Sequence, residues 1–193
     1  MVELDRAAVE ATVELLRKAT DADWARPTPC GTWNLAELTA HLTVQHHGFA
    51  AASEGAGNDL GPWQPVLAED PFGAYEQAAE RVIAAFGVPG VLEREFRLPE
   101  LSTEIAFPGA RAIGFHYLDY VVHAWDVART LDVPVPLGKD VIAPVLPIAQ
   151  QVPGGERRLL PGAAFKPAVD DGGSTDTLDQ IVALLGRDPR WKP

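Results

Sequence analysis

Cysteine is almost absent from this 193-residue sequence, which contains one, Cys30. A single thiol excludes a disulfide within the chain and is typical of a protein from a reducing compartment. A lone cysteine can be a small buried hydrophobe, a reactive group or a metal ligand, and burial is the favoured interpretation here. No basic residue stands beside Cys30 in the sequence to lower the pKa of its thiol, so we do not expect a catalytic nucleophile.

Long hydrophobic runs and basic residues are also scarce. No stretch approaches the ~18 consecutive apolar residues of a membrane span, and the N-terminus lacks the basic and apolar regions of a signal peptide. The sequence has 16 basic against 27 acidic residues, a formal net charge of -11. Such a charge disfavours nonspecific binding to phosphates. We therefore predict a cytoplasmic protein that contacts neither nucleic acid nor membrane.

Helical periodicity is the main pattern that is present. Asn34 and Glu37 have the spacing of a capping box, which marks the start of a second helix. Pro134 and Pro136 end the fourth helix, because proline cannot continue one. Apolar residues recur at helical spacing in each of the predicted helices, which span residues 3–20, the segment from Asn34 onward, 71–86 and about 110–131.

The remaining segments are shorter. Residues 92–98 alternate charged and apolar side chains, which predicts a short strand. Beyond the fourth helix we expect a strand over 165–169 and a last helix over about 175–185. The length allows one well-buried domain with a small appended segment. We predict a mainly α protein, with an antiparallel four-helix bundle over residues 1–138 and a short α/β extension over 139–193 packed on it.

The helix over residues 110–131 carries a stripe of ionisable side chains. His116, Asp119, His123 and Asp126 follow one another at steps of three and four residues, which places them on one face. The rest of the helix is apolar nearly all round, so the stripe should be buried. Buried carboxylates are costly unless they are compensated. A hydrogen-bonded network of histidine and aspartate would compensate them, and so would a divalent metal ion.

A histidine on the second helix favours the metal ion. His41 lies on the core-facing stripe between Leu38 and Leu42, where an unpartnered imidazole would be poorly placed. Together with Asp119 and His123 it would form a three-ligand site that leaves one coordination position open, as catalytic zinc sites do.

The other histidines have several interpretations. His116 is a candidate general base or substrate contact, and a satisfied core histidine is the alternative. If the metal site were closed, His116 would also be the suspected fourth ligand. His46 and His47 rotate away from the face of His41, so we expect them to be solvated.

Three distinct motifs follow one another along the chain. They are Pro27-Thr28-Pro29-Cys30-x-x-Trp33 with Leu38-x-x-His41-Leu42, then Asp119-x-x-x-His123-x-Trp125-Asp126-x-Ala128, then Leu184-Leu185-Gly186-Arg187-Asp188-Pro189-x-Trp191. In order and spacing, and nearly end to end, they resemble the mycothiol-dependent maleylpyruvate isomerase-like family of the DinB-like superfamily.

The resemblance implies a DinB-like four-helix bundle with His41, Asp119 and His123 as ligands, usually of zinc and sometimes of nickel or another divalent ion. It also implies mycothiol, a low-molecular-weight thiol, as cosubstrate: its sulfur would ionise at the metal and attack an electrophile. The sequence departs from the isomerase itself in having aspartate at 119, where glutamate is expected, and in a shorter segment after the fourth helix.

Two further residues have candidate roles. Arg187 could bind a substrate carboxylate bidentately, or it could be a cation that the dipole of the last helix favours. Asp126 could orient His123, or it could form a surface salt bridge.

The leading functional hypothesis is a metal- and thiol-dependent transferase or isomerase that acts on a small electrophilic substrate, as a monomer or homodimer. A metal-dependent hydrolase and a non-enzymatic metal-binding protein of stress or regulatory type are the alternatives. The occupant of the fourth coordination position discriminates an enzyme from a binding protein.

Overall fold

Four long helices dominate the computed structural model, which describes residues 1–160 and 163–193. They confirm the four helices predicted from the sequence, although the first ends at Leu16 rather than at residue 20. The four are α1 (Val2–Leu16), α2 (Leu35–Ser53), α3 (Pro71–Phe86) and α4 (Gly109–Leu131).

Capping groups set the ends of these helices. The Asn34 side chain accepts a hydrogen bond of 2.9 Å from the Glu37 amide, and the Glu37 carboxylate accepts one of 2.9 Å from the Asn34 amide, so the predicted capping box is present. The Asp70 side chain caps α3 by accepting from the amide of Gly73. α4 ends where Asp132 adopts the left-handed conformation, with φ 56°.

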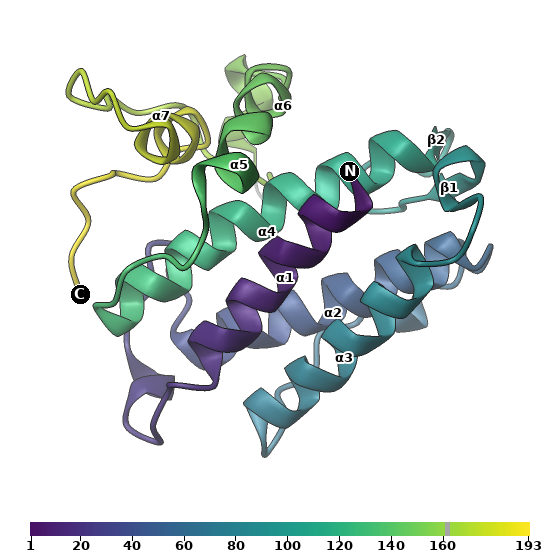
Figure 1. Cartoon of the computed structure of the whole chain (residues 1–193), viewed down its shortest axis with the longest axis horizontal. Coiled ribbons are helices and arrows are strands. Elements are labelled where there is room, and N and C mark those ends of the chain that lie inside the picture. The colour runs from purple at the N-terminus through teal and green to yellow at the C-terminus, as the bar shows by residue number, and fades with distance from the viewer. Residues whose placement is uncertain (161–162) are drawn as a thin grey trace.

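The helices form two parallel pairs that run in opposite directions (Figure 1). α1 lies along α4, where Asp5 meets His116, and α2 lies along α3. Helices of different pairs are antiparallel: Arg17, just after α1, forms an ion pair with Glu76 near the start of α3. The connection over residues 54–70 carries the chain back along the bundle, so that α3 begins at the same end as α2.

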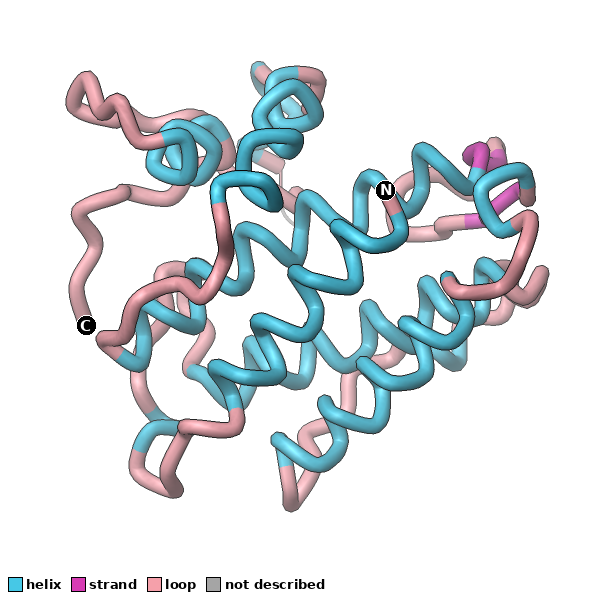
Figure 2. The backbone as a smooth tube through the Cα atoms, in the orientation of Figure 1, coloured by secondary structure: helices cyan, strands magenta, loops and turns pink. Residues whose placement is uncertain are grey.

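A short hairpin lies at one end of the bundle, drawn in magenta in Figure 2. Strands β1 (Glu95–Arg97) and β2 (Ala106–Pro108) pair in antiparallel fashion, with Phe96 opposite Phe107 and both side chains buried. β1 confirms a strand within residues 92–98, but only three residues take part. The sequence pattern did not predict β2.

In its described residues the C-terminal extension contains helices and loops but no strand. The helices are α5 (Lys139–Ile142), α6 (Leu146–Gln150) and α7 (Thr177–Leu184); a 3-10 turn joins α5 to α6, and a long connection leads to α7 (Figure 2). The strand predicted over 165–169 was wrong: no residue there pairs in a sheet, and Val169 donates one backbone hydrogen bond to Ala183. A strand needs a partner edge, and what lies beside this segment is α7.

The extension shares the hydrophobic core of the bundle. Its buried side chains include Val145, Ala149, Ile181 and Leu185, which belong to the same apolar cluster as Trp125 of α4. Burial of a valine, leucine or isoleucine side chain contributes ~1.5–3 kcal/mol. The structure is therefore the predicted mainly α bundle with a short C-terminal extension packed on it.

Short 3-10 helices lie in the connections between the other helices. They span Asp23–Ala25, Gly61–Trp63, Val91–Glu93, Ala143–Val145 and Gly155–Leu159. Within residues 1–160 and 163–193, no helix has the length and apolar character needed to cross a membrane.

A glycine on α2 makes room for the long connection. Trp63 packs on Gly48 so closely that a Cβ added there would lie 2.4 Å from the indole ring. We expect Gly48→Ala to lower the free energy of unfolding by ~1–3 kcal/mol, because a buried ring must move. Urea unfolding measures this change.

Gly114 of α4 provides the matched control. A Cβ there would meet only the end of the Met1 side chain, at 3.9 Å. Gly114→Ala should leave stability unchanged or raise it by up to ~1 kcal/mol, since alanine is the better helix former. Equal effects of the two substitutions would show that the Trp63 contact does not limit residue 48.

Candidate metal centre

The three predicted ligands lie together between α2 and α4. His41, Asp119 and His123 each offer one ligand atom, and these atoms lie within 4.8 Å of one another. Nε2 of His123 is 3.3 Å from Oδ1 of Asp119. The rings of His41 and His123 meet edge to face, with their centroids 5.7 Å apart. Two imidazole nitrogens and one carboxylate oxygen are zinc-type donors, so the residues fit a divalent ion.

His41 is held in a form suited to metal binding. The Trp33 ring lies 4.8 Å from the His41 ring, centroid to centroid. Burial lowers the pKa of His41 to about 4, and the nearby charge of His123 acts in the same direction. The His41 imidazole is therefore neutral at pH 7, which is the form that binds metals.

Asp126 lies behind His123 and fixes the orientation of its ring. Oδ2 of Asp126 is 2.9 Å from Nδ1 of His123, and it accepts a hydrogen bond of 3.2 Å from Nη2 of Arg187. All three side chains are buried. Metal-binding histidines commonly donate from their second nitrogen to a carboxylate in this way. The arrangement leaves Nε2 of His123 facing Asp119.

Two carboxylates surround His123 and set its protonation. Burial opposes the charge of Asp119, yet His123 and His41 hold the pKa of that carboxyl well below its usual range. Burial likewise opposes the charge of Asp126, yet Arg187 and His123 lower its pKa. Burial would lower the pKa of His123, but Asp119 and Asp126 raise it to about 9. In the metal-free chain both ring nitrogens of His123 are therefore protonated at neutral pH, and the imidazole is positively charged.

Arg187 reaches this region from the segment after α7. Its side chain is 5% exposed, and its guanidinium lies 5.5 Å from the centre of the Phe165 ring. Nη1 donates to the carbonyl of Leu185 and Nη2 to Asp126. The ion pair with Asp126 was not among the two roles that the sequence left open. Contact between Arg187 and a substrate carboxylate stays a prediction.

The structure does not bring His116 to the three ligands. Its Nδ1 lies 2.6 Å from Oδ1 of Asp5, and its Nε2 lies 3.1 Å from Nδ1 of His46. The ring is fully buried and stacks on Tyr120, with centroids 4.3 Å apart. His116 also precedes His123 by two helical turns, a rise of about 10 Å. With both nitrogens engaged, it has the position of a satisfied core histidine rather than of a fourth ligand.

The expectation that His46 is solvated was wrong, since its side chain is 0% exposed. α2 packs against α3, α4 and the 3-10 turn at Gly61–Trp63, so most of its circumference is covered. His46 lies on a second buried face of α2, where its ring stacks on the Tyr120 ring with the two centroids 4.2 Å apart. His47 is partly buried.

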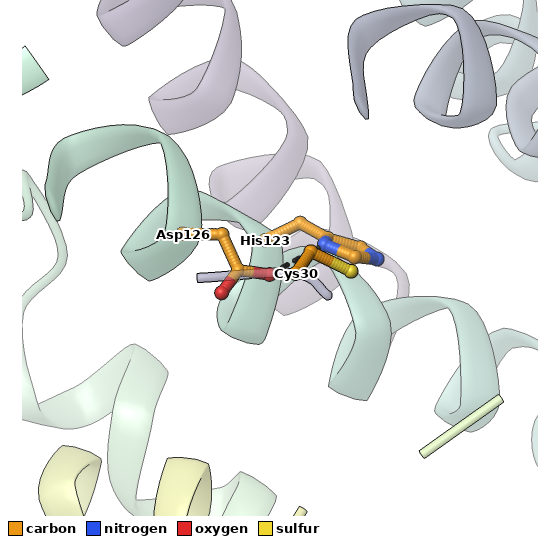
Figure 3. Close-up of side chains that lie close together, drawn as sticks. All are labelled: Cys30, His123 and Asp126. Atoms are coloured by element: carbon orange, nitrogen blue, oxygen red, sulfur yellow. Dashed lines mark hydrogen bonds and ion pairs between the residues drawn. The ribbon is translucent and has the colours of Figure 1, made fainter. Parts of the chain in front are cut away.

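Cys30 is a neighbour of the site that sequence reasoning did not include. One ligand atom each from Cys30, His123 and Asp126 lie within 4.8 Å of one another, so His123 belongs to two such groups (Figure 3). Nη2 of Arg187 is 3.6 Å from the sulfur. Burial, assisted by the charge of Asp126, raises the pKa of the thiol to about 12. The residue type pointed to a possible ligand, but only the fold shows that the turn before α2 lies over α4.

Two hollows in the described part of the chain lie elsewhere. They measure about 350 and 590 Å³ and are lined by residues of the extension, among them Gln150 and Leu184. Neither is lined by a metal ligand. These two hollows are therefore not part of the candidate metal centre.

Comparison with known sequences gives the family. Residues 6–128 match the family described as mycothiol maleylpyruvate isomerase N-terminal domain, a stretch that covers more than half of the chain and all three ligands. The protein belongs to this family. Its members are DinB-like metal-binding proteins, and the ligand clusters of this chain accord with that.

The two relatives found are described as uncharacterised proteins. Two proteins of Mycobacterium tuberculosis, from the strains CDC 1551 / Oshkosh and H37Rv, are each 28% identical to this chain over 189 residues. The alignment covers 95% of this chain and 95% of each relative. No solved structure matches the chain.

Metal content tests the ligand assignment. We expect the purified protein to hold about one divalent ion per chain and His123→Ala to lose it, because His123 supplies one of the three predicted ligand atoms. Elemental analysis of the dialysed protein measures this. His47→Ala, a histidine substitution elsewhere on α2, should keep the metal. Full metal content in His123→Ala would contradict the site.

Metal binding should also release a proton. Because the pKa of His123 is about 9 without metal, an incoming ion must displace this proton at any lower pH. We expect release of at least about one proton per ion at pH 7.5, and an affinity that falls at least about tenfold for each pH unit below 9. Calorimetry in buffers of different ionisation enthalpy counts the protons. An affinity that is flat between pH 7 and 9 would contradict the protonated His123.

Proposed function

We propose that this protein is a metal-dependent enzyme that uses a low-molecular-weight thiol of the mycothiol type in S-transfer to, or isomerisation of, a small electrophilic substrate. The observation that carries the proposal is a ligand set of three residues, two histidines and one aspartate, within 4.8 Å. Three protein ligands leave a position for an exchangeable group, as in catalytic zinc sites. The family's name connects that group with mycothiol.

Access from solvent supports an enzyme. The Asp119 side chain is 24% exposed, whereas that of His123 is 3% exposed. The site is thus buried on the side of His123 and open on the side of Asp119. A cosubstrate can approach from the open side, while Asp126 and Arg187 hold the ring from the closed side.

In this function each residue of the site would have a distinct role. His41, Asp119 and His123 would hold the ion, which is expected to be zinc, with nickel or another divalent ion also able to fit such donors. When bound, the ion would supply the positive charge that keeps the cosubstrate's sulfur ionised at neutral pH. Asp126 would keep Nε2 of His123 directed at the ion. Arg187 would fix Asp126 and is the candidate contact for a substrate carboxylate.

The two alternative functions require different groups at the fourth coordination position of the metal. A metal-dependent hydrolase would use the same ligands with water in the exchangeable position. A metal-binding protein without activity would need a fourth protein ligand, and His116 is poorly suited because Asp5 and His46 engage both of its nitrogens. The unsuitability of His116 and the exposed side of Asp119 favour the enzyme, in which any fourth protein ligand must be exchangeable.

Turnover with and without thiol tests this function. The zinc-loaded protein should consume one or more members of a panel of small electrophiles, such as unsaturated oxo acids, epoxides and activated alkenes, only when mycothiol is present. The metal-free protein should be inactive, because the sulfur would stay protonated. Chromatographic detection of the sulfur adduct or the isomer measures the reaction. Turnover without thiol would favour the hydrolase, and absence of turnover in every arm would favour the binding protein.

A further inference from the structure

We propose that Cys30 is a built-in sulfur ligand, which occupies the exchangeable coordination position until the thiol cosubstrate displaces it. This inference rests on the proposed function and names a regulation of the same site. A side chain would then keep the metal closed in the resting protein. Only a ligand that competes well with sulfur would open it.

The position of the sulfur supports this role. Cys30, His123 and Asp126 each have a ligand atom within 4.8 Å of the others. In Figure 3 the Cys30 sulfur points to the same side as the His123 nitrogen that does not bond to Asp126. That nitrogen, Nε2, is the one that faces Asp119. The sulfur thus lies within 4.8 Å of a ring nitrogen of His123, one of the three predicted ligands.

The metal position is argued independently of Cys30. His41, Asp119 and His123 form a complete ligand group without it, on side chains from two helices. A separate ion held by Cys30, His123 and Asp126 is disfavoured, because Oδ2 of Asp126 already accepts from Arg187, whose positive charge would repel a cation there. We therefore place one ion at the three ligands, with Cys30 joining it after rotation about its Cα–Cβ bond.

The backbone around Cys30 is fixed, so the sulfur cannot easily leave the site. Pro27 and Asn34 form an isolated β-bridge across the turn. The Thr28 hydroxyl donates to the Trp33 carbonyl and accepts from the Cys30 amide. Asn34 begins the helix that carries His41, and Trp33 packs on the His41 ring. One rigid segment therefore carries both the sulfur and a metal ligand.

A cysteine sulfur is a suitable ligand for such an ion once its thiol has lost its proton. On ligation a metal–sulfur bond forms and the proton passes to solvent, with no oxidation or reduction. Zinc and similar ions bind thiolates in preference to most oxygen ligands. The closed site would therefore admit a thiol cosubstrate more readily than water or a carboxylate.

Cobalt substitution tests the inference on the full chain. With a phosphine as reductant and no thiol, the cobalt-loaded protein should show a sulfur-to-metal charge-transfer band in the near ultraviolet, and Cys30→Ser should lack it. Because the chain has one cysteine, the band can come only from Cys30. A wild-type spectrum without this band would overturn the proposal.

Adding mycothiol separates this proposal from the proposed function. Cys30→Ser with mycothiol should regain the band, and its apparent affinity for mycothiol should be about tenfold higher than that of the wild type if Cys30 occupies the position ~90% of the time. Equal affinities would overturn the proposal. No band in Cys30→Ser at any thiol concentration would overturn the proposed thiol chemistry, while the wild-type spectrum without thiol still decides the role of Cys30.

A second measurement covers the case in which Cys30→Ser fails to fold or to bind cobalt. X-ray absorption by the zinc-loaded wild type should show one sulfur neighbour of the ion at about 2.3 Å, the usual zinc–thiolate distance. A spectrum that fits nitrogen and oxygen neighbours alone would overturn the proposal without use of a variant.

Discussion

The burial of ionisable side chains on one face of α4 is the constraint on which the arrangement of the other segments depends. A charge inside a protein is costly unless an opposite charge or hydrogen bonds compensate it. Different segments meet different members of this face: Asp5 of α1 and His46 of α2 meet His116, and Arg187 meets Asp126 from beyond α7. The packing of α1 beside α4 and the docking of the extension both serve this compensation.

At the candidate metal centre, the side chains other than His123 carry one more negative charge than positive charge. Asp119 and Asp126 contribute two negative charges, Arg187 contributes one positive charge, and His41 is neutral. In the metal-free chain the proton on His123 supplies the missing positive charge. A divalent cation would take over the place of that proton. The two carboxylates thus favour a positive charge at this position, which the proton of His123 supplies and the proposed ion would supply in its place.

Sequence periodicity predicted what depends on local structure. The helices could be predicted from their apolar spacing, and Asp119 with His123 from their common helix face. His46 could not, because its burial depends on α3 and α4 covering α2 from two sides. The strand over 165–169 failed for a similar reason, since a strand depends on a partner edge elsewhere in the chain. The position of Cys30 beside His123 could not be predicted, because no local pattern places a turn over a distant helix.

The contact between Arg187 and Asp126 links metal and extension in a reciprocal way. The family match ends at residue 128, so all three ligands lie within it and Arg187 lies outside. If the docked guanidinium raises the affinity for metal by a given factor, bound metal must raise the stability of docking by the same factor. The ion and the extension then behave as two cooperative ligands of one bundle, and whatever loosens either of them loosens the other.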